Sequence, residues 1–285
     1  MTAVRVAEPG DLPAMAALAA DHQADPARHC LYLSAEADAI AEEVAELEDW
    51  AAHTAVAEAD GQLVGWLFAE PDPDMGRVWW WGPFAPAEDW DGVADELYRV
   101  ASGLLGDGYG EEEAAADNRS GLIAAWAARH GLAADPGSVL LRREPTPAAV
   151  DDRVRPMADA DHDAVMALHD LAFPGTHTPP AMLVASEHPR LVIEDDGRVV
   201  GYVAYELQAD GSGYIDYLAV DEQLRSRGLG RALVSTATAD LVERGVTYAH
   251  LTVRAANGAA RALYASLGFV EERIAIPYRK GFTLP

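Results

Sequence analysis

The chain has 285 residues, of which half are hydrophobic and one is a cysteine, and its formal net charge at pH 7 is −26. This length is long for one compact domain and comfortable for two, and the hydrophobic half is enough to form real cores. The single cysteine, Cys30, excludes an intramolecular disulfide and a zinc–thiolate site, and we predict no metal. The negative charge argues against nucleic acid as a partner, because a phosphate backbone needs a basic face.

The chain carries no signal for a membrane or for export. No apolar run approaches the roughly 20 residues needed to span a bilayer, and the N-terminus lacks the basic start and apolar stretch of a signal peptide. We therefore expect a cytoplasmic protein, monomeric or homodimeric, without a membrane partner. The acidity itself has two interpretations, a preference for cationic substrates or simple solubility.

Two patterns occur twice along the chain. Val4–Asp11, a short strand followed by an aspartate that can cap a helix, recurs as Val154–Asp161. The hairpin signal Asp60–Trp66, with Asp-Gly between alternating apolar residues, recurs as Asp196–Tyr202. We infer two copies of one α+β unit, whatever family the chain belongs to.

Residues 142–152 separate the copies and carry two prolines among charged residues, which is typical of a linker. We expect an N-terminal domain over residues 1–144, a linker over 145–152 and a C-terminal domain over 153–285.

In the second copy, an apolar strand pattern over 214–220 leads into a glycine-rich turn and a helical pattern over 231–243. This arrangement aims backbone N–H groups and the helix dipole at an anion, and Gly228 and Gly230 keep side chains out of its way. The arginines at 225, 227 and 231 add positive charge in a very acidic chain. The spacing is neither that of a P-loop nor that of the dinucleotide fingerprint.

The segment Arg225-Ser-Arg-Gly228-Leu-Gly230 matches the Arg/Gln-x-x-Gly-x-Gly/Ala motif of the GNAT acetyltransferase superfamily. Residues 257–269, which end in Gly-Phe, resemble the second coenzyme A helix of that family. The resemblance covers residues 150–285. It implies an α+β fold of two tandem GNAT-like domains, each with a central mixed, mostly antiparallel sheet flanked by helices.

The resemblance also implies acetyl-CoA as cosubstrate, with its pantetheine arm between strands 214–220 and 249–254. For Asn257, contact with the cofactor and capping of the following helix are equally open. The cofactor-binding residues implied are Leu218, Ala219, Val220, Arg225, Ser226, Arg227, Gly228, Leu229, Gly230, Arg231, Asn257 and Tyr264.

Tyr264 matches the family's tyrosine, and we predict that it is the general acid that protonates the departing thiolate, since a phenol is protonated at neutral pH. The alternative is a core aromatic residue. We predict Asp216, a carboxylate within an apolar strand, as the base; a polar cross-strand pair is the alternative. Phe173, Thr176 and His177 lie in a Pro- and Gly-containing connection that forms one wall of the acceptor site in the family. His177 is either a substrate contact or base, or a solvated loop residue.

The N-terminal copy lacks this chemistry when it is aligned at a constant shift of 136 residues. Gly92 then matches Gly228, and the three arginines become Asp89, Asp91 and Asp95. Carboxylates facing a diphosphate repel it. Ala127 stands where the second copy has Tyr264, so we expect a degenerate N-terminal copy that does not bind coenzyme A.

The resemblance implies direct transfer of an acetyl group from acetyl-CoA to a primary amine, which we expect to belong to a small molecule, by the C-terminal domain. Two alternatives stay open: a non-catalytic coenzyme A-binding or regulatory protein, and an acetyltransferase that acts on a lysine or N-terminus of a protein.

Overall fold

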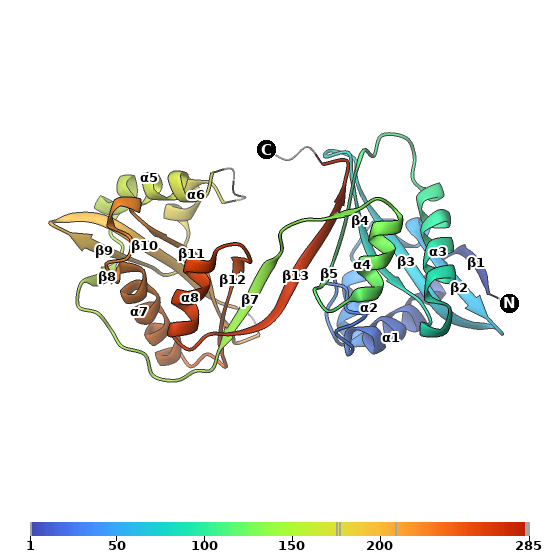
Figure 1. Cartoon of the computed structure of the whole chain (residues 1–285), viewed down its shortest axis with the longest axis horizontal. Coiled ribbons are helices and arrows are strands. Elements are labelled where there is room, and N and C mark those ends of the chain that lie inside the picture. The colour runs from blue at the N-terminus through green and yellow to red at the C-terminus, as the bar shows by residue number, and fades with distance from the viewer. Residues whose placement is uncertain (1, 175, 177, 209, 283–285) are drawn as a thin grey trace. The chain divides into compact units, whose positions relative to one another are not determined.

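The computed structural model describes residues 2–174, 176, 178–208 and 210–282 (Figure 1). The chain forms two compact units. Unit 1 comprises Met1–Gly137 and Arg273–Pro285, and unit 2 comprises Ser138–Glu272. None of the helices in the described ranges is long and apolar enough to cross a membrane.

Unit 1 is a sheet in the order β1-β2-β3-β4-β5-β13, in which only β4 and β5 are parallel neighbours, and β6 pairs with β13. Its elements are β1 (Ala3–Val6), α1 (Leu12–Gln23), α2 (Ala37–Ala45), β2 (Thr54–Ala59), β3 (Gln62–Asp72), β4 (Arg77–Phe84), α3 (Trp90–Leu104), β5 (Glu111–Asp117), α4 (Gly121–Arg129), β6 (Ala133–Ala134) and β13 (Val270–Lys280).

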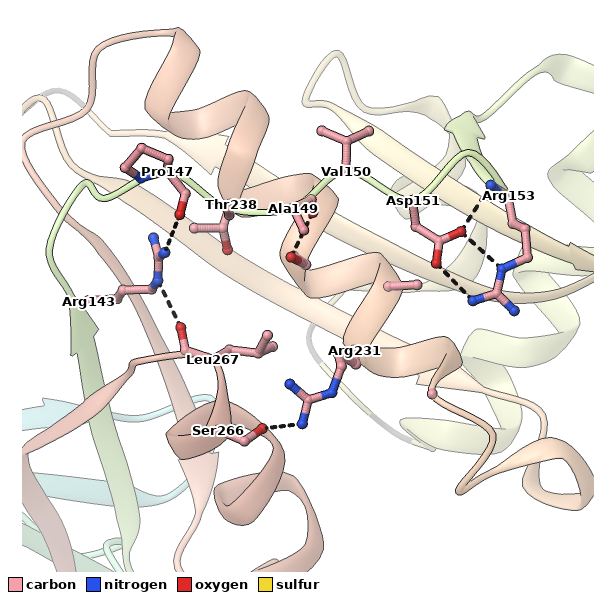
Figure 2. A pocket seen from close by; sticks show the side chains of 14 residues that line it. Arg143, Pro147, Ala149, Val150, Asp151, Arg153, Arg231, Thr238, Ser266 and Leu267 are labelled. Carbon is pink, nitrogen blue, oxygen red and sulfur yellow. Dashed lines mark hydrogen bonds and ion pairs between the residues drawn. The ribbon is translucent and has the colours of Figure 1, made fainter.

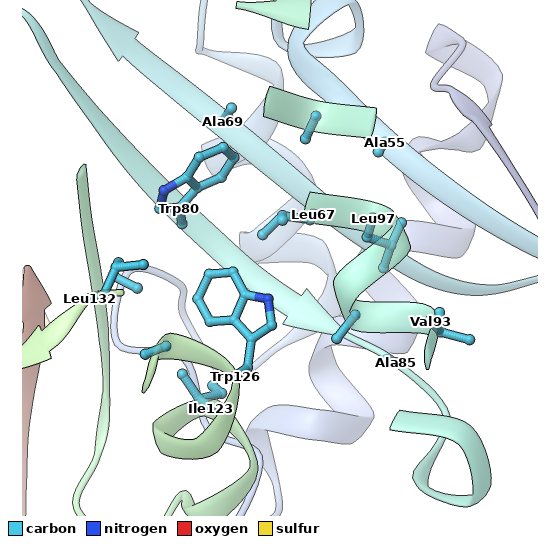
Figure 3. Close-up of a cluster of buried hydrophobic side chains, with 14 of the residues drawn as sticks. Ala55, Leu67, Ala69, Trp80, Ala85, Val93, Leu97, Ile123, Trp126 and Leu132 are labelled. Carbon is cyan, nitrogen blue, oxygen red and sulfur yellow. The ribbon is translucent and has the colours of Figure 1, made fainter. Parts of the chain in front are cut away.

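Alternate side chains of β3 enter two separate cores, because successive side chains of a strand point to opposite faces. Trp66 and Phe68 join the cluster that α1 and α2 cover, whereas Leu67 and Ala69 join the cluster under α3 and α4. Figure 3 shows this second cluster, in which the indole ring of Trp126 lies among the aliphatic side chains. Unit 1 is thus a complete layered fold with its own cores.

Unit 2 has the sheet order β7-β12-β11-β10-β9-β8, in which β11 and β12 are parallel and the other neighbours are antiparallel. Its elements are β7 (Ser138–Arg143), β8 (Val154–Pro156), α5 (His162–Ala172), α6 (Pro180–Ala185), β9 (Arg190–Asp195), β10 (Arg198–Leu207), β11 (Gly213–Val220), α7 (Leu229–Glu243), β12 (Ala249–Arg254) and α8 (Gly258–Ser266).

The helices of unit 2 lie on both faces of its sheet. Tyr202 and Ala204 of β10 join the cluster formed with α5 and α6. The Cα of the neighbouring Gly201 lies so close to α7 that a Cβ there would be 3.2 Å from a methyl of Leu233. This close approach fixes α7, and with it the loop before α7, against the sheet.

The last strand of each sequence copy joins the sheet formed by the other copy, which a continuous division of the sequence does not anticipate. β7 precedes the linker but pairs with β12 in unit 2. Residues 275–280 of β13, at the end of the second copy, pair with β5 in unit 1. The predicted ranges 1–144 and 153–285 therefore differ from the contact units, because a linker marks where the chain becomes irregular and not which sheet a strand joins.

Candidate functional site

The loop between β11 and α7 presents backbone donors at the helix start. Ser226 (φ 66°) and Gly228 (φ 81°) both adopt left-handed backbone conformations, and Gly228 is the N-cap of α7. The N–H groups of Leu229, Gly230 and Arg231 lie in the first helical turn, where no intrahelical acceptor exists. With the dipole of a 15-residue helix behind them, these groups form a site suited to an anion.

Arginine side chains surround this helix start. Arg225 Nη1 lies 3.6 Å from Glu222, and Arg227 Nη1 lies 3.8 Å from Asp195. Exposed ion pairs this long contribute little, so both charges can turn to a ligand. Arg231 donates a 2.7 Å hydrogen bond to Ser266 Oγ.

Gly230 brings the start of α7 close to its neighbours. A Cβ at this position would lie 3.4 Å from Leu263 of α8 and within 4 Å of Val220 and Leu218 of β11. A residue larger than alanine would separate the helix from the strand end. The predicted cofactor residues of β11 and α7 are therefore brought together.

β11 and β12 separate at their carboxyl ends. Within the described residues, their ladder ends at the pair Ile215 and Leu251, although β11 continues to Val220 and β12 to Arg254. The backbone of Leu218, Ala219 and Val220 lies beyond the last described pair of this ladder. The N–H and C=O groups of this backbone suit an amide-containing arm like pantetheine.

Asp216 is the extra residue of a β-bulge in β11. The register changes from Ala204 opposite Tyr217 to Tyr205 opposite Ile215, which places Asp216 at the shift. Its side chain is exposed. Side chains of β11 alternate between buried and more exposed, and Asp216 lies on the more exposed face with Tyr214 and Leu218. The carboxylate therefore does not pay the desolvation cost that burial inside an apolar strand would impose.

A cavity of about 400 Å³, here called the strand cavity, opens beside Asp216. Glu206 lies directly across the ladder from Tyr214, and its carboxylate is 3.2 Å from His188 Nε2. The cavity is lined by Thr178, Met182, Leu183, Ser186, His188, Arg190, Ala204, Tyr205, Glu206, Tyr214 and Asp216. The sequence interpretation missed Glu206, although a carboxylate at the end of an apolar strand was a signal that could have found it.

Tyr264 is buried in α8, with 7% of its surface exposed. Burial is the main cause, and the nearby Tyr214 a smaller one, that raises the pKa of Tyr264 to about 12. The phenol is therefore protonated at neutral pH. Its ring packs edge-on against Phe269 at 5.8 Å. The position suits both the predicted acid and the alternative core residue.

Asn257 caps α8. Its side-chain oxygen accepts a 3.1 Å hydrogen bond from the backbone N–H of Ala260, as the capping interpretation predicts. The amide NH₂ group points elsewhere because one oxygen serves the cap. Contact of that NH₂ group with a cofactor stays a prediction.

The predicted acceptor wall is only partly at the strand cavity. Phe173 packs against Tyr217 at 5.0 Å, and Thr176 Oγ1 lies 3.0 Å from the Tyr217 hydroxyl. Thr178, rather than either of these residues, lines the cavity. His177 lies outside the described residues.

A second cavity, here called the linker cavity, has a volume of about 520 Å³ and runs along α7 (Figure 2). Arg143 lies at one end, where it donates to the carbonyl oxygens of Leu267 (2.9 Å) and Pro147 (3.4 Å). Burial lowers the pKa of this guanidinium. The lining residues are Arg143, Pro147, Ala148, Ala149, Val150, Asp151, Arg153, Gly228, Arg231, Ala232, Ser235, Thr238, Ser266 and Leu267.

The corresponding loop of unit 1 is built differently. Residues 85–89 join β4 to α3, whereas the longer stretch 221–228 joins β11 to α7. The constant shift of 136 therefore fails here: Asp89, and not Gly92, is the N-cap, and Gly92 lies inside the helix. A carboxylate still stands at the helix start.

Unit 1 also fills the separation between β4 and β5 with its own chain. The β4–β5 ladder ends at Trp80 and Ala114, and beyond it Cys30 forms a bridge with Ala116. The side chain of Gln23 holds this segment, because it accepts from the Cys30 N–H (2.8 Å) and donates to the Cys30 carbonyl (2.7 Å). The chain occupies the place that stays open in unit 2.

The family comparison matches part of unit 2. The model of the acetyltransferase (GNAT) family matches residues 162–269. The [ribosomal protein bS18]-alanine N-acetyltransferase of Escherichia coli (strain K12) is 34% identical over 103 residues, which cover 36% of this chain and 69% of that protein. The mycothiol acetyltransferase of Thermobispora bispora is 38% identical over 93 residues, 30% of this chain and 32% of that protein.

A crystal structure of a GCN5-related N-acetyltransferase from Sphaerobacter thermophilus matches the fold along nearly the whole chain. Its TM-score is 0.69 at 21% identity, and the match covers 98% of this chain and 95% of the other. The mixed, mostly antiparallel sheets flanked by helices therefore agree with the predicted fold class.

Proposed function

The chain belongs to the GNAT acetyltransferase family, and on that premise we propose that unit 2 transfers an acetyl group directly from acetyl-CoA to the primary amine of a small molecule. One observation carries the proposal: the start of α7, the separated ends of β11 and β12, and the strand cavity follow one another along β11, from its carboxyl end at Val220 back to Asp216 and Tyr214. A two-part substrate with an anionic end and a reactive end needs this sequence of sites.

The donor chemistry of unit 2 fits coenzyme A. The first-turn N–H groups of α7, together with Arg225 and Arg227, offer charge-assisted hydrogen bonds to the diphosphate. Residues 218–220 pair with β10 on one side, and their backbone groups on the side of β12, beyond the end of that ladder, offer amide partners to the pantetheine arm. Asn257 contributes its remaining NH₂ donors.

Two carboxylates line the strand cavity and can bind and deprotonate the acceptor amine. An alkylamine has a pKa near 10.4 and arrives as an ammonium ion. Asp216 and Glu206 attract that charge, and we assign to Asp216 the removal of its proton, directly or through water. The free amine then attacks the acetyl carbonyl, the carbon–sulfur bond breaks, and the proton that the nitrogen loses as the amide forms goes to the departing thiolate.

Tyr264 is the residue that we expect to stabilise the departing thiolate of coenzyme A. With a pKa of about 12, the phenol stays protonated as the thiolate forms. Net proton transfer to a thiolate whose thiol has a pKa of about 8.5 is limited by that high value. We therefore assign to the hydroxyl a hydrogen bond that strengthens as negative charge develops on sulfur.

The function is tested by thiol release from acetyl-CoA with a panel of amines. We expect at least one small amine to release thiol, and Asp216→Asn to lower its turnover by about 10²-fold. Asp163→Asn, an exposed change on α5, is the control and should have no effect. Binding of acetyl-CoA without thiol release from any amine would favour the non-catalytic alternative.

A peptide that begins with alanine belongs in the panel, because the Escherichia coli relative is named for acting on an alanine of a ribosomal protein. Turnover of that peptide above every small amine would make the acceptor a protein N-terminus.

We expect one coenzyme A to bind per chain. In unit 1, Asp89 stands at the helix start and the segment around Cys30 fills the strand separation, and both features oppose the cofactor. Isothermal titration calorimetry with coenzyme A measures this stoichiometry. A value near two would show that the N-terminal copy has kept a site.

A further inference from the structure

Two arginines of the linker cavity, Arg143 and Arg231, form no ion pair with a carboxylate of the described residues. Within the described ranges, Arg231 bonds to Ser266 Oγ, and Arg143 bonds only to backbone carbonyl oxygens. The third arginine, Arg153, is paired with Asp151 at 2.8 Å. These two guanidinium groups stand in a chain of net charge −26.

Burial makes the charge of Arg143 costly. Only 7% of its surface is exposed, and a buried charge without a counter-ion destabilises a fold unless a ligand balances it. A guanidinium has five N–H donors. Arg143 therefore keeps donors beyond its three carbonyl contacts, and Arg231 keeps more.

The cavity adjoins the start of α7, because Gly228 is both the N-cap of the helix and a lining residue. Figure 2 shows Ser266 and Leu267 between the side chains of Arg143 and Arg231. If a ligand places its diphosphate at the helix start, the part of it that reaches these guanidinium groups should be anionic and close to the diphosphate. In coenzyme A, the ribose 3′-phosphate stands in that relation to the diphosphate.

We propose that the linker cavity receives the ribose 3′-phosphate of coenzyme A through Arg231 and Arg143, so that this protein selects coenzyme A over its 3′-dephospho form. The inference rests on the proposed function and assigns one further contact to the same cosubstrate.

Calorimetry on the full chain with coenzyme A and 3′-dephospho-coenzyme A tests the proposal. We expect the wild type to bind coenzyme A about tenfold or more tightly, since charge-assisted bonds to a phosphate are worth at least that factor. Arg231→Gln should bring the ratio of the two dissociation constants close to one. Arg143→Gln should also bring this ratio close to one. If the loss of Arg143 destabilises the fold, the ratio measured for Arg231→Gln alone decides the test.

Two control variants separate this contact from the rest of the site. Arg225→Gln should weaken both ligands by the same factor, because its predicted partner is the shared diphosphate. Arg244→Gln removes equal charge at the other end of α7, where Arg244 is paired with Asp240 at 2.6 Å, and should leave the ratio unchanged.

Equal affinity of the wild type for the two ligands, or a preference that survives Arg231→Gln, would overturn the inference while leaving the proposed function intact. Failure of the wild type to bind either ligand would overturn both.

Discussion

Replacement of Gly228 by aspartate is expected to abolish coenzyme A binding. The new carboxylate would stand at the helix start, where the first-turn N–H groups of α7 face an anion. Two like charges about 4 Å apart repel by roughly 4 kcal/mol at an intermediate dielectric constant, which corresponds to about 10³-fold in affinity. Calorimetry with coenzyme A measures the loss.

Gly228→Asn is the matched control. Asparagine has the same size as aspartate and meets the same left-handed backbone (φ 81°), but it carries no charge. Gly197→Asp, at a hairpin turn with φ 74° and open space around its Cβ position, controls for backbone strain alone. Equal losses from the aspartate and asparagine variants at 228 would mean that shape, and not charge, decides binding.

The second large effect is expected from Tyr264→Phe. Removal of the hydroxyl should lower kcat by about 10²-fold or more, because a donor aimed at developing charge acts mainly in the transition state. Affinity for coenzyme A should change little. The measurement is turnover against pH at saturating acetyl-CoA, with a working amine, for both proteins.

A core role for Tyr264 makes the opposite prediction. Phenylalanine keeps almost the whole buried volume, so turnover and its pH profile would stay unchanged. That result would remove Tyr264 from the mechanism. Phe269→Leu, which alters the ring that packs on Tyr264, reports the effect of a packing change alone.

Sequence patterns predicted the strand and the helix on either side of the glycine-rich loop of unit 2 closely. The strand expected over 214–220 is β11 (Gly213–Val220), and the helix expected over 231–243 begins two residues earlier, at Leu229. Local chemistry decides these features: glycines permit the turn, and the apolar spacing defines the helix face. The same local rule gave the cap at Asn257 as one of two open interpretations, and the structure has that cap.

The acceptor side depended on relations between distant residues. The register shift at Asp216 depends on how β11 pairs with β10. The strand cavity joins Glu206 to residues of α6. The alignment of the two copies at one fixed shift failed at Asp89 because the loop of unit 1 is shorter. No pattern along one segment contains such information.

The exchange of β7 and β13 determines which fragments of this protein keep a complete sheet. A fragment of residues 153–285, the natural choice from the linker, would lack β7 and leave the edge of β12 exposed to aggregation. It would also carry residues 275–280 without the β5 partner that they have in the whole chain. A fragment from Ser138 to Glu272 instead retains every strand of the proposed catalytic sheet, whereas the other unit needs two separate pieces of the chain.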